Sequence, residues 1–381
     1  MNALQQAIRH YQNPTHSLTD RNDTAQSIVA YISADVPVEL IIVAGMMPHR
    51  IKGNPESSIH LANKYLKSNF NPFFTSIFDR ILDLTYSFAN RLILSNLDES
   101  VVRLFYYLRE IQRLEPDPKI PPVDYFEFLH LKSETSLQYN RKQIEHFKQK
   151  IEQWASKTIS DKDLWDAIAI CNENRKSLAK LADLRRQGRV SGVDALQLIG
   201  TSMLMSKQEH NQLLQRFFTE YIPLSQPDSV RIYVEGSSLD NTQLYEMIES
   251  SGAIVVAEDS DWGNRIIEGQ IAESGNPLDA ITDFYFNRAP YPTKASIDER
   301  AEYCLNQAQK AQADGVIFFI YNGDQPALWD YPEQKKALDA QGIPSLYLPQ
   351  QPYNLNENPD LKQEIKAFVQ SISPAKERLN S

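Results

Sequence analysis

Residues 314–323 read Asp-Gly-Val-Ile-Phe-Phe-Ile-Tyr-Asn-Gly, and the seven residues from Gly315 to Tyr321 are the stretch that decides the fold. This run is apolar at successive positions and does not alternate with polar residues. A strand with that pattern must be covered on both faces, as in a parallel sheet that lies between two layers of helices. We therefore predict a buried parallel strand within an α/β protein.

The sequence around this strand alternates between further strands and helices. One helix begins at a capping box, Ser296-Ile297-Asp298-Glu299, which satisfies the first free amides of the helix. Gly252 and Gly342 end two other helices. Alternation of this kind requires right-handed crossovers and gives a doubly wound parallel sheet. The predicted strands are 230–234, 253–257, 315–321 and 345–348, and the predicted helices are about 240–251, 296–312 and 332–341.

The first third of the chain shows the same alternation less regularly, and a helical stretch follows it. The predicted strands of this third are 39–44, 91–94 and 125–129, with a helix over 98–109. In the helical stretch, Leu137, Ile144 and Ile151 recur at the spacing of one helix face. We predict three parts, namely an N-terminal α/β lobe (1–135), a helical segment (136–225) and a C-terminal α/β lobe (226–381).

Composition excludes several classes of protein. The chain has 381 residues with a formal net charge of −10, which argues against broad electrostatic binding to nucleic acid. The local basic run 185–189 is interpreted as a solvated helix end. No stretch reaches the 18 consecutive apolar residues of a membrane span, and no signal peptide is visible, so we expect a cytoplasmic protein. The two cysteines, Cys171 and Cys304, form neither a disulfide framework nor a zinc pattern.

Candidate site residues follow the predicted strands, because open parallel sheets bind ligands beyond the carboxyl ends of their strands. Five loops meet this condition, and in two facing lobes they would converge on one cleft: 45–50, 95–100, 235–238, 258–265 and 322–325. Neither a G-x-G-x-x-G nor a G-x-x-x-x-G-K-[ST] loop is present, so no nucleotide is expected. The candidates in these loops are His49, Arg50, Leu97, Asp98, Glu235, Asp259, Trp262, Arg265, Asn322 and Asp324.

Each candidate has a structural alternative. Arg50 and Arg265 are the candidates for an anionic group, because a guanidinium offers a planar, charged fork. Trp262 could stack on a flat ligand or pack against the other lobe. Asp98 could simply cap a helix. His49 has no partner at metal-ligand spacing. The acidic residues 258–261 match no calcium loop, and the residues 322–324 could form only a turn.

Taken in order, these motifs resemble the D-component subunits of 2-hydroxyacyl-CoA dehydratases and the related benzoyl-CoA reductase subunits. The resemblance covers about residues 35–355 and rests on five stretches. They are Ala44-Gly45-Met46-Met47-Pro48-His49-Arg50, Asp98-Glu99-Ser100 with the helix after it, Arg231-Ile232-Tyr233-Val234-Glu235-Gly236-Ser237, Asp314-Gly315-Val316-Ile317 and Gly342-Ile343-Pro344.

The resemblance implies two flavodoxin-like lobes with a [4Fe–4S] cluster between them, held by cysteines from strand-end loops. It also implies a two-subunit assembly that receives an electron from an ATP-driven activator. In this chain Asn71 and Leu97 stand at two cluster positions, and Asn322, Gly323 and Asp324 occupy the third loop. Because clusters need thiolate ligands, we expect no family-type cluster and predict no other cofactor.

Three functional hypotheses remain. The first is a cluster-free subunit that pairs with a cysteine-bearing paralogous subunit, and with an ATP-dependent activator, to act on an acyl-CoA thioester. The second is a divergent enzyme that acts on an acyl thioester or another small acid without a metal. The third is a non-catalytic protein that binds a small ligand or regulates a partner. We favour the first, because the scaffold and the cleft are retained.

Overall fold

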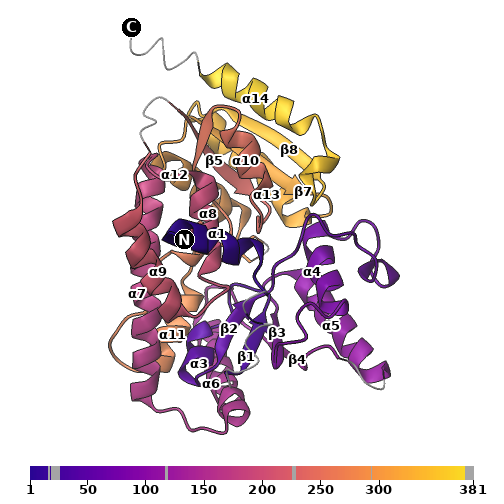
Figure 1. Ribbon diagram of the computed structural model, residues 1–381, viewed down its shortest axis with the longest axis vertical. Helices are drawn as coiled ribbons and strands as arrows, with labels where there is room; N and C mark the ends of the chain where they lie inside the picture. Colours follow the sequence, from indigo (N-terminus) through magenta and orange to yellow (C-terminus); the bar gives the residue numbers. More distant parts are fainter. Residues whose placement is uncertain (16–17, 19–25, 116–118, 225–228, 293, 374–381) are drawn as a thin grey trace.

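Two four-stranded parallel sheets form the framework of the protein (Figure 1). The computed structural model describes residues 1–15, 18, 26–115, 119–224, 229–292 and 294–373. The strand orders are β2-β1-β3-β4 and β6-β5-β7-β8, so each sheet repeats the same doubly wound arrangement. The strands are β1 (Ile28–Tyr31), β2 (Met47–Arg50), β3 (Arg91–Ser95), β4 (Val123–Phe126), β5 (Val230–Gly236), β6 (Ala253–Glu258), β7 (Gly315–Tyr321) and β8 (Ser345–Gln351). The predicted fold class, two parallel-sheet lobes with helices, is confirmed.

The helices cover both faces of each sheet. In the N-terminal lobe they are α3 (Val38–Val43), α4 (Pro72–Leu82) and α5 (Glu99–Leu114), and in the C-terminal lobe α10 (Gln243–Glu249), α12 (Ile297–Lys310), α13 (Gln325–Asp339) and α14 (Leu361–Ile372). Helix α11 (Pro277–Phe286) follows β6 in the sequence but packs into the core that holds residues of β1 and β3 of the N-terminal lobe. The predicted capping box is present, since the Ser296 hydroxyl accepts from the Glu299 amide and the Glu299 carboxylate accepts from the Ser296 amide.

Strand β7 has the environment that its sequence predicted. All seven residues are buried, and β7 pairs with β5 on one side and β8 on the other. Ile317 and Phe319 join the core that includes residues of α10 and α14. Val316 and Phe318 face the opposite core, with residues of α12 and α13. Because alternate residues enter two different cores, no position of the strand tolerates a polar side chain.

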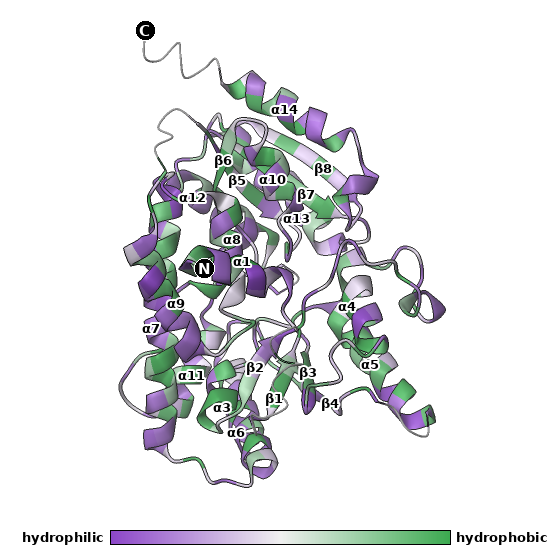
Figure 2. Cartoon of the chain, viewed as in Figure 1, coloured by the Kyte–Doolittle hydropathy of each residue, from purple (hydrophilic) through white to green (hydrophobic). Residues whose placement is uncertain are grey.

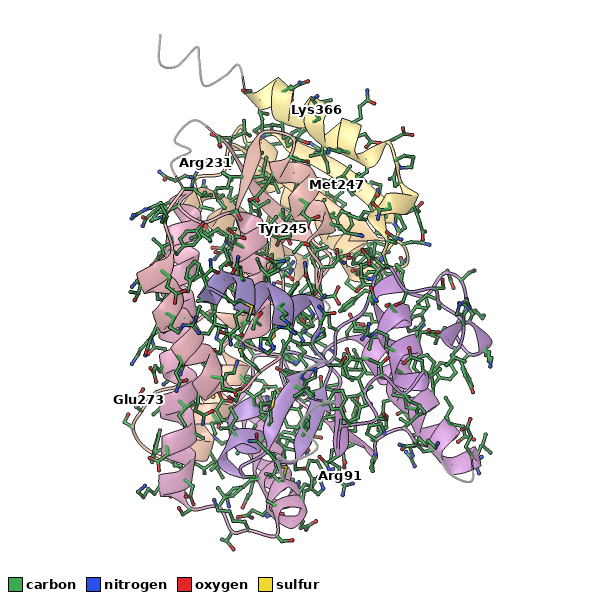
Figure 3. The ribbon with its side chains drawn as sticks, in the orientation of Figure 1. Arg91, Arg231, Tyr245, Met247, Glu273 and Lys366 are labelled. Carbon is green, nitrogen blue, oxygen red and sulfur yellow. The ribbon has the colours of Figure 1, made fainter. Side chains whose placement is uncertain are left out.

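The carboxyl ends of the two sheets face each other. Arg91, the first residue of β3, lies toward the lower end of the molecule, and Arg231, the second residue of β5, lies toward the upper end (Figure 3). Both strands therefore run toward the middle of the molecule, where the loops after their last residues meet. This opposed arrangement places the loops of both lobes around one shared space.

A helical layer runs along both lobes. It contains α6 (Glu134–Ala155), α7 (Asp161–Arg186), α8 (Gly192–Thr201) and α9 (Lys207–Glu220), and the N-terminal helix α1 (Ala3–Gln12) packs on α8 and α9. The 26-residue α7 contacts α3 of one lobe and β6 of the other (Figure 1). This helix thus spans both lobes. The domain boundaries at 135/136 and 225/226 stay a prediction, and residues 225–228, next to the second boundary, lie outside the described residues.

The strand predicted at residues 39–44 is wrong, because Val38–Val43 is helix α3. A short apolar run cannot be assigned to a strand or a helix by periodicity alone. Figure 2 shows α3 as almost uniformly hydrophobic. Its single carboxylate, Glu39, is fully buried and pairs with Arg175 of α7. Although burial opposes ionisation, this arginine lowers the pKa of Glu39.

The predicted loop 45–50 is likewise wrong over most of its length, because Met47–Arg50 is the edge strand β2. It pairs in parallel with β1, a strand that the sequence analysis missed, and Ala30 lies opposite His49. Both strands have only four residues, too few to show a period. Residues 47–50 are therefore not a loop at the carboxyl end of the sheet. The loop after β1, which contains Asp35, lies at that end.

Two smaller expectations also need correction. Helix α13 begins at Gln325, seven residues before its predicted start, and it accommodates Pro332 internally. The basic run at the end of α7 is not fully solvated, because Arg185 is completely buried and pairs with Glu258 of β6. Tertiary pairing has overridden the general preference of a cationic helix end for solvent.

Ile317 is fully buried, so a charged side chain at this position should strongly destabilise the fold. Replacing Ile317 by Asp places a carboxylate in a fully buried strand without a partner, which costs several kcal/mol. We expect Ile317→Asp to be insoluble or to lose cooperative thermal unfolding, measured by circular dichroism. The matched control is Ile222→Asp, at a residue that is 86% exposed, and it should melt like the wild type. A soluble, cooperatively melting Ile317→Asp protein would contradict the assignment.

Candidate functional site

A cleft of about 500 Å³ opens between the carboxyl ends of the two sheets. This volume is within the usual range for small-molecule sites. The N-terminal lobe contributes the residues after β1, β3 and β4, namely Ala34, Asp35, Leu97, His130, Leu131 and Lys132. The C-terminal lobe contributes most of the rest, including Asp261, Arg265, Glu268, Tyr285, Arg288, Tyr291, Lys294, Glu299 and Tyr303.

The structure brings Leu97 and Arg265 into the lining of this cleft, together with Asp261 from the same loop as Arg265. The other predicted site residues do not line the cleft. They are His49, Arg50, Asn71, Asp98, Glu235, Asp259, Trp262, Asn322 and Asp324.

Arg50 and Trp262 lie together beneath the cleft. The Arg50 guanidinium is 2.5 Å from the Asp261 carboxylate and donates to the carbonyl of Ile32 at 3.0 Å. Its central carbon lies 4.5 Å from the centre of the Trp262 ring, in a cation–π contact. Trp262 is fully buried. The tryptophan therefore packs between the lobes, and the charge of Arg50 is neutralised by Asp261.

Arg265 belongs to a buried charge network in the C-terminal lobe. Its guanidinium donates to Asp259 at 2.8 Å, and Arg300 donates to the same carboxylate at 2.6 Å. Although burial opposes ionisation, these two cations hold the pKa of Asp259 below its usual range. Arg300 also binds Glu235 at 2.9 Å. Burial, with Asp259 nearby, raises the pKa of Glu235 to about 8.

The loops that carry Asn71 and Gly323 touch across the two lobes. The Asn71 side chain caps α4 by accepting from the amide of Phe73 at 3.0 Å. Gly323 has a φ of +76°, and a Cβ added there would lie 2.5 Å from the carbonyl oxygen of Asn69. Glycine is therefore required at position 323 both by its backbone conformation and by the close approach of the opposite lobe.

Two aspartates flank this contact. Asp98 caps α5 and accepts from the Ser100 amide at 2.6 Å, which agrees with the capping interpretation. Asp324 accepts from the Ser237 hydroxyl at 2.6 Å. Burial raises the pKa of Asp98, and burial raises the pKa of Asp324 to about 6. Asn322, which directly precedes Gly323 in the same loop, is exposed.

His49 lies inside the N-terminal lobe. Its ring is fully buried beside the rings of Tyr86 and Phe88. Burial lowers the pKa of His49 to about 4, so the imidazole is neutral at physiological pH. This position offers no route to a ligand in the cleft.

The sequence analysis missed several cleft residues. Asp35 follows β1, a strand that was not predicted, and Arg288 follows α11, a helix that was not predicted either. His130 was within reach, because it comes directly after the predicted strand 125–129 and so satisfies the strand-end rule. A fuller application of that rule to the first lobe would have found it.

The family model described as 2-hydroxyglutaryl-CoA dehydratase, D-component, matches residues 33–372. The chain belongs to this family. It is a 2-hydroxyacyl-CoA dehydratase or benzoyl-CoA reductase-like subunit.

Similar proteins of this family match most of the chain. The (R)-phenyllactyl-CoA dehydratase beta subunit of Clostridium sporogenes is 21% identical over 368 residues, covering 95% of this chain and 96% of the relative. A benzoyl-CoA reductase subunit of Thauera aromatica is 24% identical over 321 residues, covering 81% and 82%. The beta subunit of (R)-2-hydroxyglutaryl-CoA dehydratase from Acidaminococcus fermentans is 21% identical, covering 81% and 83%. No helix in the described ranges is long and apolar enough to cross a bilayer.

The residues of this dehydratase-family chain do not fit a thiolate-held iron–sulfur cluster. Cys171 and Cys304 are buried in α7 and α12, and burial raises the pKa of both thiols. The positions where the resemblance places cluster ligands carry the Asn71 amide, the Leu97 isobutyl group and, in the third loop, Asn322, Gly323 and Asp324. Among the residues that the structure describes, no three His, Cys, Asp or Glu side chains are grouped to hold a metal ion.

The raised pKa of Asp324 predicts a pH-dependent stability difference. Between the ordinary pKa of 3.8 and the folded value of about 6, the folded protein keeps a proton that the unfolded chain releases. Stability from this group is therefore present below pH 4 and lost as the pH rises through 6. Asp324→Asn removes this loss, so its gain over the wild type should grow from pH 4 to pH 7 by about 2 kcal/mol.

Urea unfolding at several pH values measures this difference. Asp298→Asn, at an exposed position of α12, is the matched control for the loss of one carboxylate. A constant difference between Asp324→Asn and the wild type from pH 4 to pH 7 would contradict the ionisation assigned to Asp324.

Proposed function

We propose that this chain is a cluster-free, cytoplasmic subunit of a dehydratase or reductase that acts on an acyl-CoA thioester. The observation that carries the proposal is the cleft of about 500 Å³, which both lobes line at their strand ends. The family's two-lobed scaffold is thus kept around a space large enough for an acyl group. The positions where the resemblance places cluster ligands, in contrast, carry Asn71, Leu97 and Asp324 in place of soft ligands.

Arg288 is the arginine of the cleft whose guanidinium we assign to a ligand. Arg50 and Arg265 are paired with Asp261 and Asp259. Arg288 instead donates to backbone carbonyls, those of Ala34 at 2.8 Å and of Arg265. Within the described ranges no ion pair joins Arg288 to a carboxylate, and Glu268 of the same cleft is the carboxylate whose charge acts on it. We therefore assign to Arg288 the contact with an anionic or polarised oxygen of the ligand.

The redox step of such an assembly has to lie in another chain, because this one offers no thiolates at the lobe contact. The relatives described above carry the names of subunits. We propose a hetero-oligomer with a cysteine-bearing paralogous subunit that holds the [4Fe–4S] cluster and receives its electron from an ATP-dependent activator. This chain would complete the assembly and bind the thioester.

The first consequence concerns iron. The purified chain should be colourless after anaerobic reconstitution with iron and sulfide, because it lacks grouped thiolates. Iron, acid-labile sulfide and the visible spectrum measure this, with a ferredoxin reconstituted in parallel as the positive control. Iron and sulfide approaching the four of each in a [4Fe–4S] cluster, with a visible absorption band, would contradict the proposal.

The second consequence concerns thioester binding. A ligand at a hundred times its Kd stabilises the fold by about 2.7 kcal/mol, which corresponds to a thermal shift of a few degrees. We expect such a shift with 2-hydroxyacyl-CoA or benzoyl-CoA esters and a clear loss of it in Arg288→Ala. The control is Arg103→Ala, at a residue whose side chain is 63% exposed on α5.

The same melting screen can contradict the proposal. The absence of a shift with every thioester, also after addition of a cysteine-bearing paralogue, would favour a non-catalytic interaction protein. A shift that survives Arg288→Ala would contradict the role of this arginine.

A further inference from the structure

We infer that His130, oriented by Asp35, is a proton-transfer residue in the cleft that acts on the carbon next to the thioester carbonyl of an acyl-CoA. The inference rests on the proposed function, because it requires an acyl thioester in the cleft. It adds a metal-free reaction of this chain itself, distinct from any redox step in a partner.

The geometry begins at the end of β1. Asp35 is buried, and its Oδ1 accepts a hydrogen bond from the Ser95 hydroxyl at 2.6 Å. Its Oδ2 lies 3.6 Å from Nε2 of His130, and the His130 side chain is 14% exposed. Both Asp35 and His130 line the cleft. Nε2 is buried without a hydrogen-bond partner and is the ring nitrogen near the carboxylate, so we assign Nδ1 to the ligand.

The order of these contacts defines the chemistry. Ser95 donates to Asp35 and not to His130, so the set is not the triad of a serine hydrolase, in which the histidine activates the hydroxyl. Asp35 is instead the residue that lies between the other two, because Ser95 donates to its Oδ1 and the His130 ring faces its Oδ2. At 3.6 Å the carboxylate makes no direct hydrogen bond to the ring, and its role in the proposal is to stabilise by its charge the imidazolium that forms when the ring takes up a proton.

The loop that carries His130 is fixed on two sides. The Phe128 amide donates to Asn96 Oδ1 at 2.9 Å, which ties the loop to the end of β3. The Leu129 amide and carbonyl both bind the side chain of Asn140 in α6, at 2.8 and 2.7 Å. The Phe128 ring also meets the His130 ring edge-on, with centroids 5.7 Å apart. A site residue held in this way is preorganised for reaction.

A cation lies beside this pair. Arg288 donates to the carbonyl of Ala34, the residue directly before Asp35. The Arg288 guanidinium and the His130 imidazole thus both lie against the loop after β1, at the neighbouring residues Ala34 and Asp35. Positive charge placed where negative charge develops is a major source of rate enhancement.

The proposed step balances without a redox partner. The C–H bond next to the thioester carbonyl breaks, and its proton moves to Nδ1 of His130. The electron pair of that bond forms the C=C bond of the enolate, and the carbonyl oxygen becomes an oxyanion near Arg288. Return of a proton from the imidazolium restores the thioester, so the reaction is visible as exchange with solvent hydrogen.

The test is deuterium exchange into butyryl-CoA by the full chain in D₂O, measured by mass spectrometry. General acid–base catalysis contributes about 100- to 10,000-fold, so His130→Gln should lower the exchange rate at least 100-fold. His146→Gln, at an exposed histidine of α6, is the matched control and should exchange like the wild type. In His130→Ala, added imidazole should restore part of the rate, which loss of structure alone would not explain.

Asp35 is a positioning residue and has a different signature. Asp35→Asn should lower the exchange rate at saturating thioester about 10-fold or more, since the imidazolium loses its partner. The thioester concentration that gives half of the maximal rate should stay unchanged, because Asp35 is assigned to position His130 and not to bind the thioester. The thermal shift by butyryl-CoA checks in each variant that the cleft still binds.

The outcomes separate the two proposals. A normal thioester shift without exchange, or exchange that persists in His130→Gln, overturns the role of His130 and leaves the proposed function standing. Release of free CoA thiol in place of exchange also overturns it, because His130 would then activate water. The absence of any thioester shift overturns the proposed function and this inference together.

Discussion

The matching of buried charge at the strand ends is the constraint on which the rest of the structure depends. Arg50, from β2, is 2% exposed and forms its ion pair with Asp261, which follows β6 in the other lobe. Arg185 and Glu258 are both fully buried and connect the helical layer to β6. Removal of one member of such a pair leaves a buried charge without a partner, which typically costs about 3–5 kcal/mol. The relative position of the lobes, and with it the shape of the cleft, is therefore fixed by electrostatics as much as by packing.

Local sequence patterns predicted the C-terminal lobe better than the N-terminal lobe, for a physical reason. Strand β7 has seven buried residues and α12 has a complete capping box, so both are specified by neighbouring residues. Strands β1 and β2 have four residues each, and the helix between them has six. Elements this short owe their conformation to tertiary contacts. The pairing of Glu39 with Arg175, 136 residues away, is an example that no local pattern contains.

The same limit applies to the site. The strand-end rule correctly selects the region, because it follows from the topology of parallel sheets. It cannot say which charged residues remain available, since Arg50 and Arg265 have the same chemistry as Arg288 and differ only in their partners. Availability for a ligand is decided by the contacts of the folded chain. In this family scaffold, the wall of the cleft keeps charged and titratable side chains, while the contact between the lobes is a packed interface.

Gly323 sets how closely the two lobes approach each other. Its backbone is left-handed, and an added Cβ would lie 2.5 Å from the carbonyl oxygen of Asn69 in the opposite lobe. Any larger side chain at this position, cysteine included, would occupy the same volume as that backbone. A single substitution at position 323 would therefore have to separate the lobes at this point, whatever chemistry it introduced.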